Sequence, residues 1–301
     1  MKIDRAKAQT QAIKAMSMID KAQLIKSVGT NRNYLACLTH LTQFIKDHHL
    51  GDLRQTTKET AVRFLEAKAD SYSQKTLDMH RQAFQAFFIA RGDLGKNEKL
   101  PIVKSHIETV LEHRAYTPEQ VNLIIKSMKE KNAFSTILAY RCGLRAHELF
   151  TIRKLEEQTP HVRYDAEGKL KNINTKWQGR EIGIPYSVVG KGGPIREIRV
   201  PEELVVKLEE KRLPFPVRIQ DRGIFYESYY NLAGGHAWSS AFSAASKRVL
   251  GWSTGAHGLR HSYAQERMDE LKESLFYSQQ LETVSQELGH FRKDITLVYL
   301  R

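Results

Sequence analysis

Residues 257–262 of this 301-residue chain read HGLRHS, which sets one arginine between two histidines. Apolar residues at helical spacing over 257–271 predict that this segment lies at the start of a helix. His257 and Arg260 are three positions apart, so their side chains share one face of that helix. A guanidinium presents a planar fork that matches phosphate oxygens, which a lysine does not. The segment therefore predicts a helix with one face directed at a phosphate group.

A second segment, residues 141–149, reads RCGLRAHEL and supplies another arginine beside an acid. It lies in a stretch over 133–153 that the pattern predicts to be helical, with an interruption at the Cys-Gly pair. Arg145 and Glu148 are three positions apart and share a face in such a helix. Arginines from two separate segments, Arg145 and Arg260, can bind both non-bridging oxygens of one phosphodiester.

A third segment ends the chain, where Leu-Gly-His at 288–290 is followed nine positions later by Tyr299. Nine residues make two and a half turns of a straight helix, which would place His290 and Tyr299 on opposite sides of it. A break between them is therefore required. We predict that Gly289 ends one helix and that Asp294 begins a short new helix that carries Tyr299.

Together the three segments resemble the catalytic signatures of the tyrosine recombinases, also called the phage integrase family. Those signatures have the forms Gly-Leu-Arg-x-x-Glu-Leu, His-x-Leu-Arg-His, and Leu-Gly-His followed nine residues later by tyrosine. The match covers Ala139 to Arg301 in order and spacing, while the N-terminal half is similar only in being a small helical unit. The resemblance implies an enzyme that cleaves and rejoins DNA through a 3′-phosphotyrosyl intermediate, without metal, ATP or another cofactor.

The resemblance also implies a role for each residue of these segments. Tyr299 would attack phosphorus. Because a phenol is mostly protonated at neutral pH, this attack needs a base, and His257 would accept the proton. Arg145, Arg260 and His290 would stabilise the charge on the phosphoryl oxygens, in place of a metal ion.

Two further roles complete the expected site. The leaving 5′-hydroxyl needs a general acid, which by resemblance is a lysine in a β-hairpin turn, and Lys191 in the stretch GKGGP at 190–194 fits that description. Lys176 is the alternative. Glu148 would lie behind Arg145 and orient it. Three other histidines are expected to be structural: His147, His236 and His261.

The predicted fold class is mainly α with a small antiparallel β-sheet. Apolar spacing predicts three helices in the first hundred residues, at 33–48, 58–68 and 73–90. Alternating residues and glycine-rich punctuation over 173–201 predict a hairpin with its turn at 191–194. Further helices are predicted to start at Thr117 and to cover 202–211, 239–250, 257–271 and 278–288.

A domain boundary is predicted where periodicity is lost. Residues 95–114 lack a sustained pattern and contain Pro101, which is typical of a linker. Residues 117–120, Thr-Pro-Glu-Gln, form a capping box that starts a new helix. We therefore expect a helical core-binding domain that binds DNA over 1–100, a linker over 101–115 and a mixed α/β catalytic domain over 116–301.

The charge balance favours a polyanionic partner. Lys and Arg number 47 against 34 Asp and Glu, a net charge of +13, and cations that neutralise DNA phosphates release condensed counterions. No apolar run has the length of a membrane span, and the basic N-terminus lacks the apolar core of a signal peptide. The two separated cysteines, Cys37 and Cys142, indicate a reducing compartment rather than structural zinc. These features predict a cytoplasmic, nucleoid-associated protein that binds double-stranded DNA and no membrane.

Three functions agree with these observations. A site-specific recombinase or integrase would bind its recombination site as a dimer and form a tetramer in the synapse. A type IB topoisomerase-like enzyme would religate the same strand as a monomer. A DNA-binding accessory protein would keep the fold without cleaving. Only Leu300 and Arg301 follow Tyr299, whereas many members carry a further segment that docks on a neighbouring protomer, so either the chain is trimmed or another element links the protomers.

Overall fold

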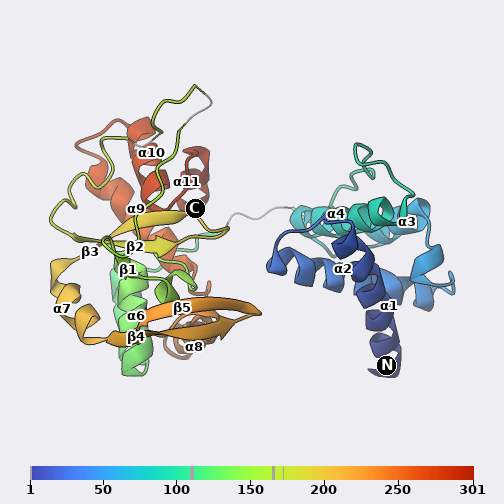
Figure 1. The fold of residues 1–301 in the computed structure, drawn as a ribbon, viewed down its shortest axis with the longest axis horizontal. Coiled ribbons are helices and arrows are strands. Elements are labelled where there is room, and N and C mark those ends of the chain that lie inside the picture. Colours follow the sequence, from blue (N-terminus) through green and yellow to red (C-terminus); the bar gives the residue numbers. More distant parts are fainter. Residues whose placement is uncertain (1, 109–111, 165–166, 172) are drawn as a thin grey trace. The chain divides into compact units, whose positions relative to one another are not determined.

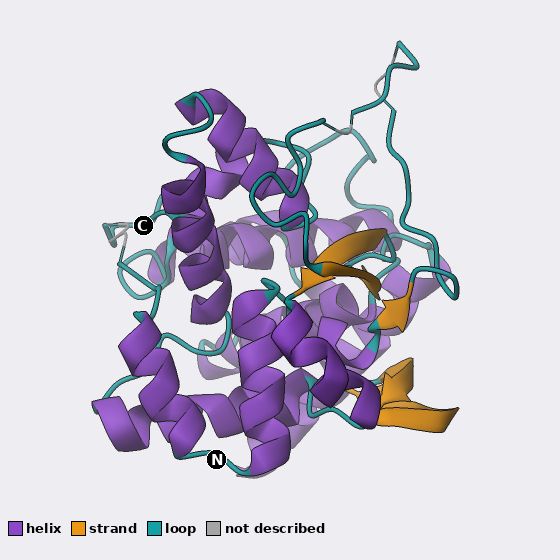
Figure 2. Cartoon of the chain, turned by 90° about the vertical axis from the view of Figure 1, so that its left-hand side faces the viewer, coloured by secondary structure: helices purple, strands orange, loops and turns teal. Residues whose placement is uncertain are grey.

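The computed structural model describes residues 2–108, 112–164, 167–171 and 173–301 (Figure 1). The chain divides into two compact units, Met1–Val110 and Leu111–Arg301, and each unit has a hydrophobic core of its own. Helices make up about half of the described residues, and the strands form two small antiparallel sheets (Figure 2). The predicted fold class is therefore confirmed, with one sheet more than expected. No helix of the described ranges has the length and apolar character needed to cross a bilayer.

The three helices predicted in the first unit are present. Thr57 caps the second of them by accepting a hydrogen bond from the backbone nitrogen of Thr60 at 3.2 Å. Gly92 ends the third with a φ of 91°, a conformation that a side chain disfavours. The helices are α2 (Val28–Asp47), α3 (Lys58–Ala67) and α4 (Gln74–Arg91).

A fourth helix in this unit, α1 (Lys2–Lys21), was not predicted from the sequence. Its inward face consists largely of alanines, including Ala8, Ala12 and Ala15, together with Ile19. Alanine is the best helix former but adds little hydrophobic contrast to a basic segment, so the amphipathic pattern is weak. Packing against α2 buries this face.

The second unit contains the predicted helices and a short helix at the end of the chain. Thr117 and Gln120 form the expected capping box at the first of them. The helices are α5 (Pro118–Lys126), α6 (Glu130–Arg141), α7 (Glu202–Glu210), α8 (Gly235–Leu250), α9 (Gly258–Leu271), α10 (Tyr277–Glu287) and α11 (Asp294–Tyr299).

The predicted helix over 133–153 is wrong in its second half. Helix α6 ends at Arg141, and the chain continues through Gly143, which has a φ of 58°. A Cβ atom at this glycine would lie 2.9 Å from side-chain atoms of Leu288 and Tyr263, so the turn brings the backbone against α9 and the end of α10. Beyond it only a 3₁₀ turn, Glu148–Phe150, remains helical.

The predicted hairpin is confirmed in a three-stranded sheet of order β1-β2-β3. Strands β1 (Arg153–Lys154), β2 (Ile184–Val189) and β3 (Ile195–Val200) are antiparallel neighbours. In the β2–β3 turn, the backbone nitrogen of Gly190 donates to the carbonyl of Pro194 at 2.7 Å. The sheet thus presents the turn at one of its ends.

A second hairpin, β4 (Arg212–Asp221) and β5 (Ile224–Tyr230), was not predicted. Pro214 and Pro216 interrupt the strand pattern of β4, and the pairing is irregular between Arg212 and Val217. Two successive residues with positive φ, Arg222 and Gly223, close the hairpin.

Two hydrophobic cores hold the helices and strands of the second unit together. The larger one packs α5, α6 and α8 with strands β2 and β3. The smaller one lies between α9, α10 and α11 and includes the nearly buried side chain of Tyr299. The short final helix is thereby fixed against α9 and α10.

Candidate active site

The structure brings the predicted arginine, histidine and tyrosine side chains of the three segments together. Nη2 of Arg145 lies 3.1 Å from Nε2 of His290, and that nitrogen lies 3.3 Å from the hydroxyl of Tyr299. The guanidinium of Arg260 lies 5.6 Å from the centroid of the Tyr299 ring. The ring of His257 lies 5.7 Å from the same ring, centroid to centroid.

The end of one helix just before Gly289 and the start of another at Asp294 make this cluster possible. Helix α10 ends before Gly289, whose φ of 75° turns the chain out of the helix, and Asp294 begins α11 as predicted. His290 and Tyr299 therefore lie on the same side, although a straight helix would separate them. His257 lies at the first turn of α9, one turn before Arg260.

Glu148 is fully buried and serves as the anionic centre of the site. Its carboxylate accepts hydrogen bonds from the backbone nitrogen of Arg145 at 2.8 Å, from Nη1 of Arg145 at 2.6 Å and from Nη2 of Arg196 at 2.7 Å. Burial raises the pKa of this carboxyl, but the charges of Arg196, Arg260 and Arg145 outweigh burial and hold the pKa far below its ordinary value. Glu148 therefore stays ionised and orients the guanidinium of Arg145.

Arg260 is also fully buried and ties two segments together. It donates to the carbonyl of Gly143 and, at 2.9 Å, to the carbonyl of Leu288. Desolvation, followed by the charge of Arg145, lowers the pKa of Arg260 to about 10, so the guanidinium remains charged at neutral pH. Within the described part of the chain its Nε has no hydrogen-bond partner. A buried cation with an unused donor is suited to bind an anion.

The two candidate histidines are neutral at physiological pH. Desolvation and the charges of Arg260 and Arg145 lower the pKa of His290 to about 4. Desolvation and the charge of Arg260 also lower the pKa of His257 to about 3, although part of this side chain is exposed to solvent. Each neutral imidazole has a lone pair that can accept a proton, but these lowered pKa values make both rings weak bases in the free protein.

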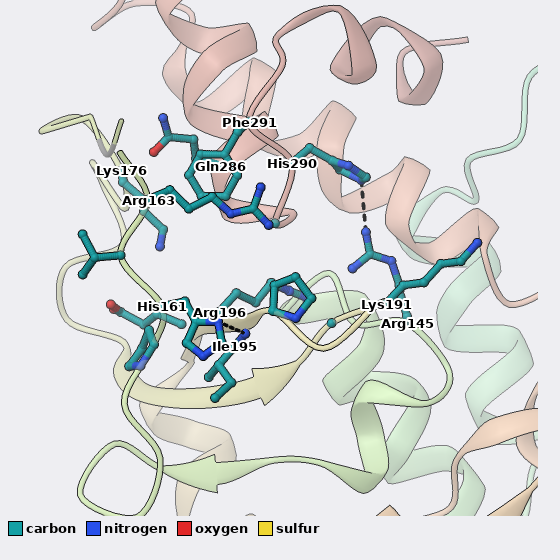
Figure 3. A pocket seen from close by; sticks show the side chains of 16 residues that line it. Arg145, His161, Arg163, Lys176, Lys191, Ile195, Arg196, Gln286, His290 and Phe291 are labelled. Atoms are coloured by element: carbon teal, nitrogen blue, oxygen red, sulfur yellow. Dashed lines mark hydrogen bonds between the residues drawn. The ribbon is translucent and has the colours of Figure 1, made fainter. Parts of the chain in front are cut away.

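A cavity of about 440 Å³ opens beside Arg145 and His290 (Figure 3). Both candidate general acids line it: Lys191 is exposed in the β2–β3 turn, and Lys176 is partly buried. Among the described residues its lining contains one acid, Glu197, and five side chains of lysine and arginine: Arg145, Arg163, Lys176, Lys191 and Arg196. The cavity is therefore electropositive and suits an anionic ligand.

One residue of the site was missed in the sequence. Arg196 is buried on β3 and bonds Glu148, the carbonyl of Gly143 at 3.1 Å and the carbonyl of Glu287 at 2.6 Å. Its signal was an arginine at an inward position of an alternating strand. His261, expected to be structural, is buried with its ring centroid 5.0 Å from that of Tyr299.

In the ranges that the structure describes, no group of three or more His, Cys, Asp or Glu residues is placed to hold a metal ion. The cluster instead joins a phenol, neutral imidazoles and fixed guanidiniums. Such a set can bind a phosphodiester and supply a nucleophile to it.

Comparisons with known proteins were made on sequence and on structure. No protein-family model and no curated protein matches the sequence. The structure of XerH site-specific recombinase bound to its difH substrate is similar with a TM-score of 0.56 and 16% identity, over 96% of this chain and 81% of that chain. The structure of a lambda integrase dimer bound to a COC′ core site is similar with a TM-score of 0.59 and 17% identity, over 95% of this chain and 76% of that chain. The structure of a lambda integrase tetramer bound to a Holliday junction has a TM-score of 0.57 and 16% identity, with the same coverage of both chains.

These similarities establish the fold. The chain has the fold of the tyrosine recombinases over more than nine tenths of its length, and the resemblance read from the three segments is confirmed at that level.

Proposed function

We propose that this chain is a tyrosine-type site-specific DNA recombinase or integrase, which cleaves and rejoins DNA through a 3′-phosphotyrosyl intermediate at Tyr299. One observation carries the proposal: three segments that are far apart in sequence place Tyr299 beside Arg145, Arg260 and His290. Each residue alone has an ordinary structural explanation, but their convergence fits phosphoryl transfer, and two of them, Arg145 and His290, line an electropositive cavity.

In the proposed mechanism the arginines bind the scissile phosphate. Arg145 is held by Glu148, and Arg260 is held by the carbonyls of Gly143 and Leu288. Because the protein fixes these donors before DNA arrives, they stabilise the negative charge of the transition state with little reorganisation. His290 adds a further hydrogen bond to the phosphoryl oxygens, which requires its ring to leave the state in which Nε2 accepts from Arg145.

The hydroxyl oxygen of Tyr299 attacks phosphorus and forms the tyrosyl phosphodiester, while the bond from phosphorus to the 5′-oxygen breaks. The phenolic proton passes to the neutral imidazole of His257, and the leaving 5′-oxygen takes a proton from Lys191. The energy of the phosphodiester is kept in the tyrosyl linkage, so a 5′-hydroxyl of another strand reverses the step. The proposed reaction therefore uses neither metal nor ATP.

The proposed partner is double-stranded DNA that carries a specific recombination site. The net charge of +13 and the basic cavity support it. We assign residues 1–100 to a core-binding domain, 101–115 to a linker and 116–301 to the catalytic domain. Similar structures were solved as a dimer on a core site and as a tetramer on a junction, and by analogy we propose that the protein acts as a dimer per site and a tetramer in the synapse. We propose that it does so in the cytoplasm, at the nucleoid.

The test is a trapping experiment without Mg²⁺ or ATP. Duplexes selected from a random pool for tight binding receive a nick near each candidate cleavage position, so that the short cleaved fragment diffuses away. Denaturing electrophoresis of wild type and Tyr299→Phe should show a covalent protein–DNA adduct in the wild type alone. Tight binding without an adduct would instead support an accessory DNA-binding protein.

A second assay separates the recombinase from a type IB topoisomerase-like enzyme, which shares this chemistry. The recombinase should join strands from two duplexes and assemble on DNA as a dimer or tetramer. Relaxation of supercoils by a monomer, without joining of two duplexes, would favour the topoisomerase.

A further inference from the structure

The electropositive cavity extends beyond the groups that the proposed reaction uses. Figure 3 shows Arg145, His290 and Lys191 toward one end, and Lys176, Arg163 and His161 toward the other. We call the second group, together with Phe291, the distal subsite. The mechanism proposed above uses none of its side chains, although Lys176 is the alternative to Lys191 as general acid.

Lys176 forms no salt bridge among the described residues, although the charges of Glu197 and Glu287 act on it. Within the described ranges no carboxylate lies at ion-pair distance from it, and its Nζ lies 5.1 Å from the centroid of the Trp177 ring. Glu197, the acid that lines the cavity, pairs with Arg199 at 2.8 Å instead. The side chain of Lys176 is partly buried, and desolvation lowers the pKa of its ammonium group. An anion in the cavity would offset this cost.

Arg163 is held in position by an aromatic ring rather than by an acid. Its guanidinium carbon lies 4.4 Å from the centroid of the Phe291 ring, and none of the acids that the structure describes forms a salt bridge with it. Stacking fixes the plane of the guanidinium while its N–H groups stay available for phosphate oxygens. Phe291 directly follows His290, so the same short segment places residues at both ends of the cavity.

His161 provides a third donor. Its backbone nitrogen donates to the carbonyl of Ile195 at 3.0 Å, and its Nδ1 accepts a hydrogen bond from the backbone nitrogen of Ile195 at 3.4 Å. Because Nδ1 is an acceptor, the neutral ring carries its proton on Nε2. Among the described residues Nε2 of His161 has no hydrogen-bond partner, so it can donate toward a ligand.

We propose that Lys176, Arg163 and His161 form a binding subsite for a DNA backbone phosphate next to the scissile phosphate on the same strand. The inference rests on the proposed function. Backbone phosphates recur at every nucleotide, so a strand whose scissile phosphate lies at Arg145 carries another one further along the same continuous cavity. The subsite positions the strand and reads no base, since phosphate contacts carry no direct sequence information.

The test neutralises one phosphate at a time. A series of duplexes carries a single uncharged methylphosphonate at each position flanking the cleavage site, and both the Kd and the rate of adduct formation are measured. For the wild type, neutralisation at one position should weaken binding roughly tenfold, which corresponds to about 1.4 kcal/mol. Lys176→Met should weaken binding of unmodified DNA to a similar extent, with no further loss at that one position.

Control variants separate contact from structure. Lys176→Arg should restore most of the affinity, and Lys247→Met, which removes an exposed lysine of α8 outside the cavity, should keep the full methylphosphonate effect. Thermal unfolding of Lys176→Met should show no loss of stability, because the substitution removes a desolvated charge and keeps the apolar stem.

The outcomes distinguish the two proposals. Equal methylphosphonate effects in wild type and Lys176→Met at every position would overturn the subsite, while adduct formation by Tyr299 would leave the proposed function standing. Absence of any adduct would overturn the proposed function, and the Kd values would still decide whether Lys176 contacts a phosphate.

Discussion

The hydroxyl oxygen of Tyr299 lies 3.3 Å from Nε2 of His290, and Nη2 of Arg145 lies 3.1 Å from the same nitrogen. A guanidinium only donates hydrogen bonds, so Nε2 is an acceptor and the neutral ring carries its proton on Nδ1. The Tyr299 hydroxyl therefore donates to His290 in the free protein. Among the described contacts of His257 there is no hydrogen bond to this hydroxyl, so the role of base proposed for His257 requires an adjustment when DNA binds.

The two histidines can be separated by substitution. His257→Gln should lower the rate of adduct formation by about 10²–10⁴-fold, because it removes the proposed proton acceptor. The measurement is a single-turnover rate on nicked DNA, with Kd determined in parallel to show that binding is retained. A near-normal rate for His257→Gln together with loss of activity in His290→Gln would transfer the role of base to His290.

The pH dependence follows from the lowered pKa values of His257 and His290, about 3 and about 4. Both rings must be neutral for the proposed chemistry. Their activity is therefore complete above those values and is lost as the pH falls through them. The second-order rate at subsaturating DNA, which reports the free protein, should stay level from pH 8 to about pH 5. A decline centred near pH 6.5, the ordinary value for histidine, would contradict the electrostatic account of the site.

Glu148→Gln should destabilise the second unit by about 3–5 kcal/mol, because it leaves buried guanidiniums without their anion. Chemical unfolding can be followed by tryptophan fluorescence, which reports this unit alone, since the three tryptophans are Trp177, Trp238 and Trp252. Glu210→Gln, at an exposed acid of α7, should change stability by less than about 0.5 kcal/mol. The double variant Glu148→Gln, Arg196→Met should lose less free energy of unfolding than the sum of the losses in the two single variants.

Lys191 and Lys176 can be assigned with a modified leaving group. When sulfur replaces the bridging 5′-oxygen, the leaving thiolate is a much weaker base than an alkoxide and needs no general acid. Lys191→Met should slow cleavage of ordinary DNA by about 10²–10⁴-fold, and its cleavage rate should recover on the sulfur substrate. Lys176→Met should gain no such selective recovery. The reverse pattern would make Lys176 the acid and leave Lys191 as an exposed turn residue.

Features that depend on a few neighbouring residues could be predicted from the sequence. The capping box at Thr117, the end of α4 at Gly92 and the break at Gly289 each act within a few positions, so their signals are local. The three signature segments likewise predicted which side chains lie together, because their order and spacing were visible along the chain.

Features that depend on distant partners could not be predicted in this way. Arg196 acts through Glu148, Gly143 and Glu287, which lie 48, 53 and 91 positions away in the chain. The interruption at Cys142-Gly143 was predicted, but the helical prediction for the residues after it was wrong, because tertiary packing at Gly143 rather than local propensity determines the path of the chain. Helix α1 was overlooked because its buried face is built mainly from alanine.

The carbonyl oxygen of Leu288 accepts hydrogen bonds from Arg260 at 2.9 Å and from Arg145 at 3.4 Å. One anchor of both arginines that we propose to bind phosphate is therefore a main-chain atom, which every amino acid possesses. Substitution at position 288 is constrained by the apolar packing of its side chain and not by this contact. A distant relative can thus keep the anchor while its residue at that position differs, and the anchor is inherited through backbone shape without leaving a mark in the sequence.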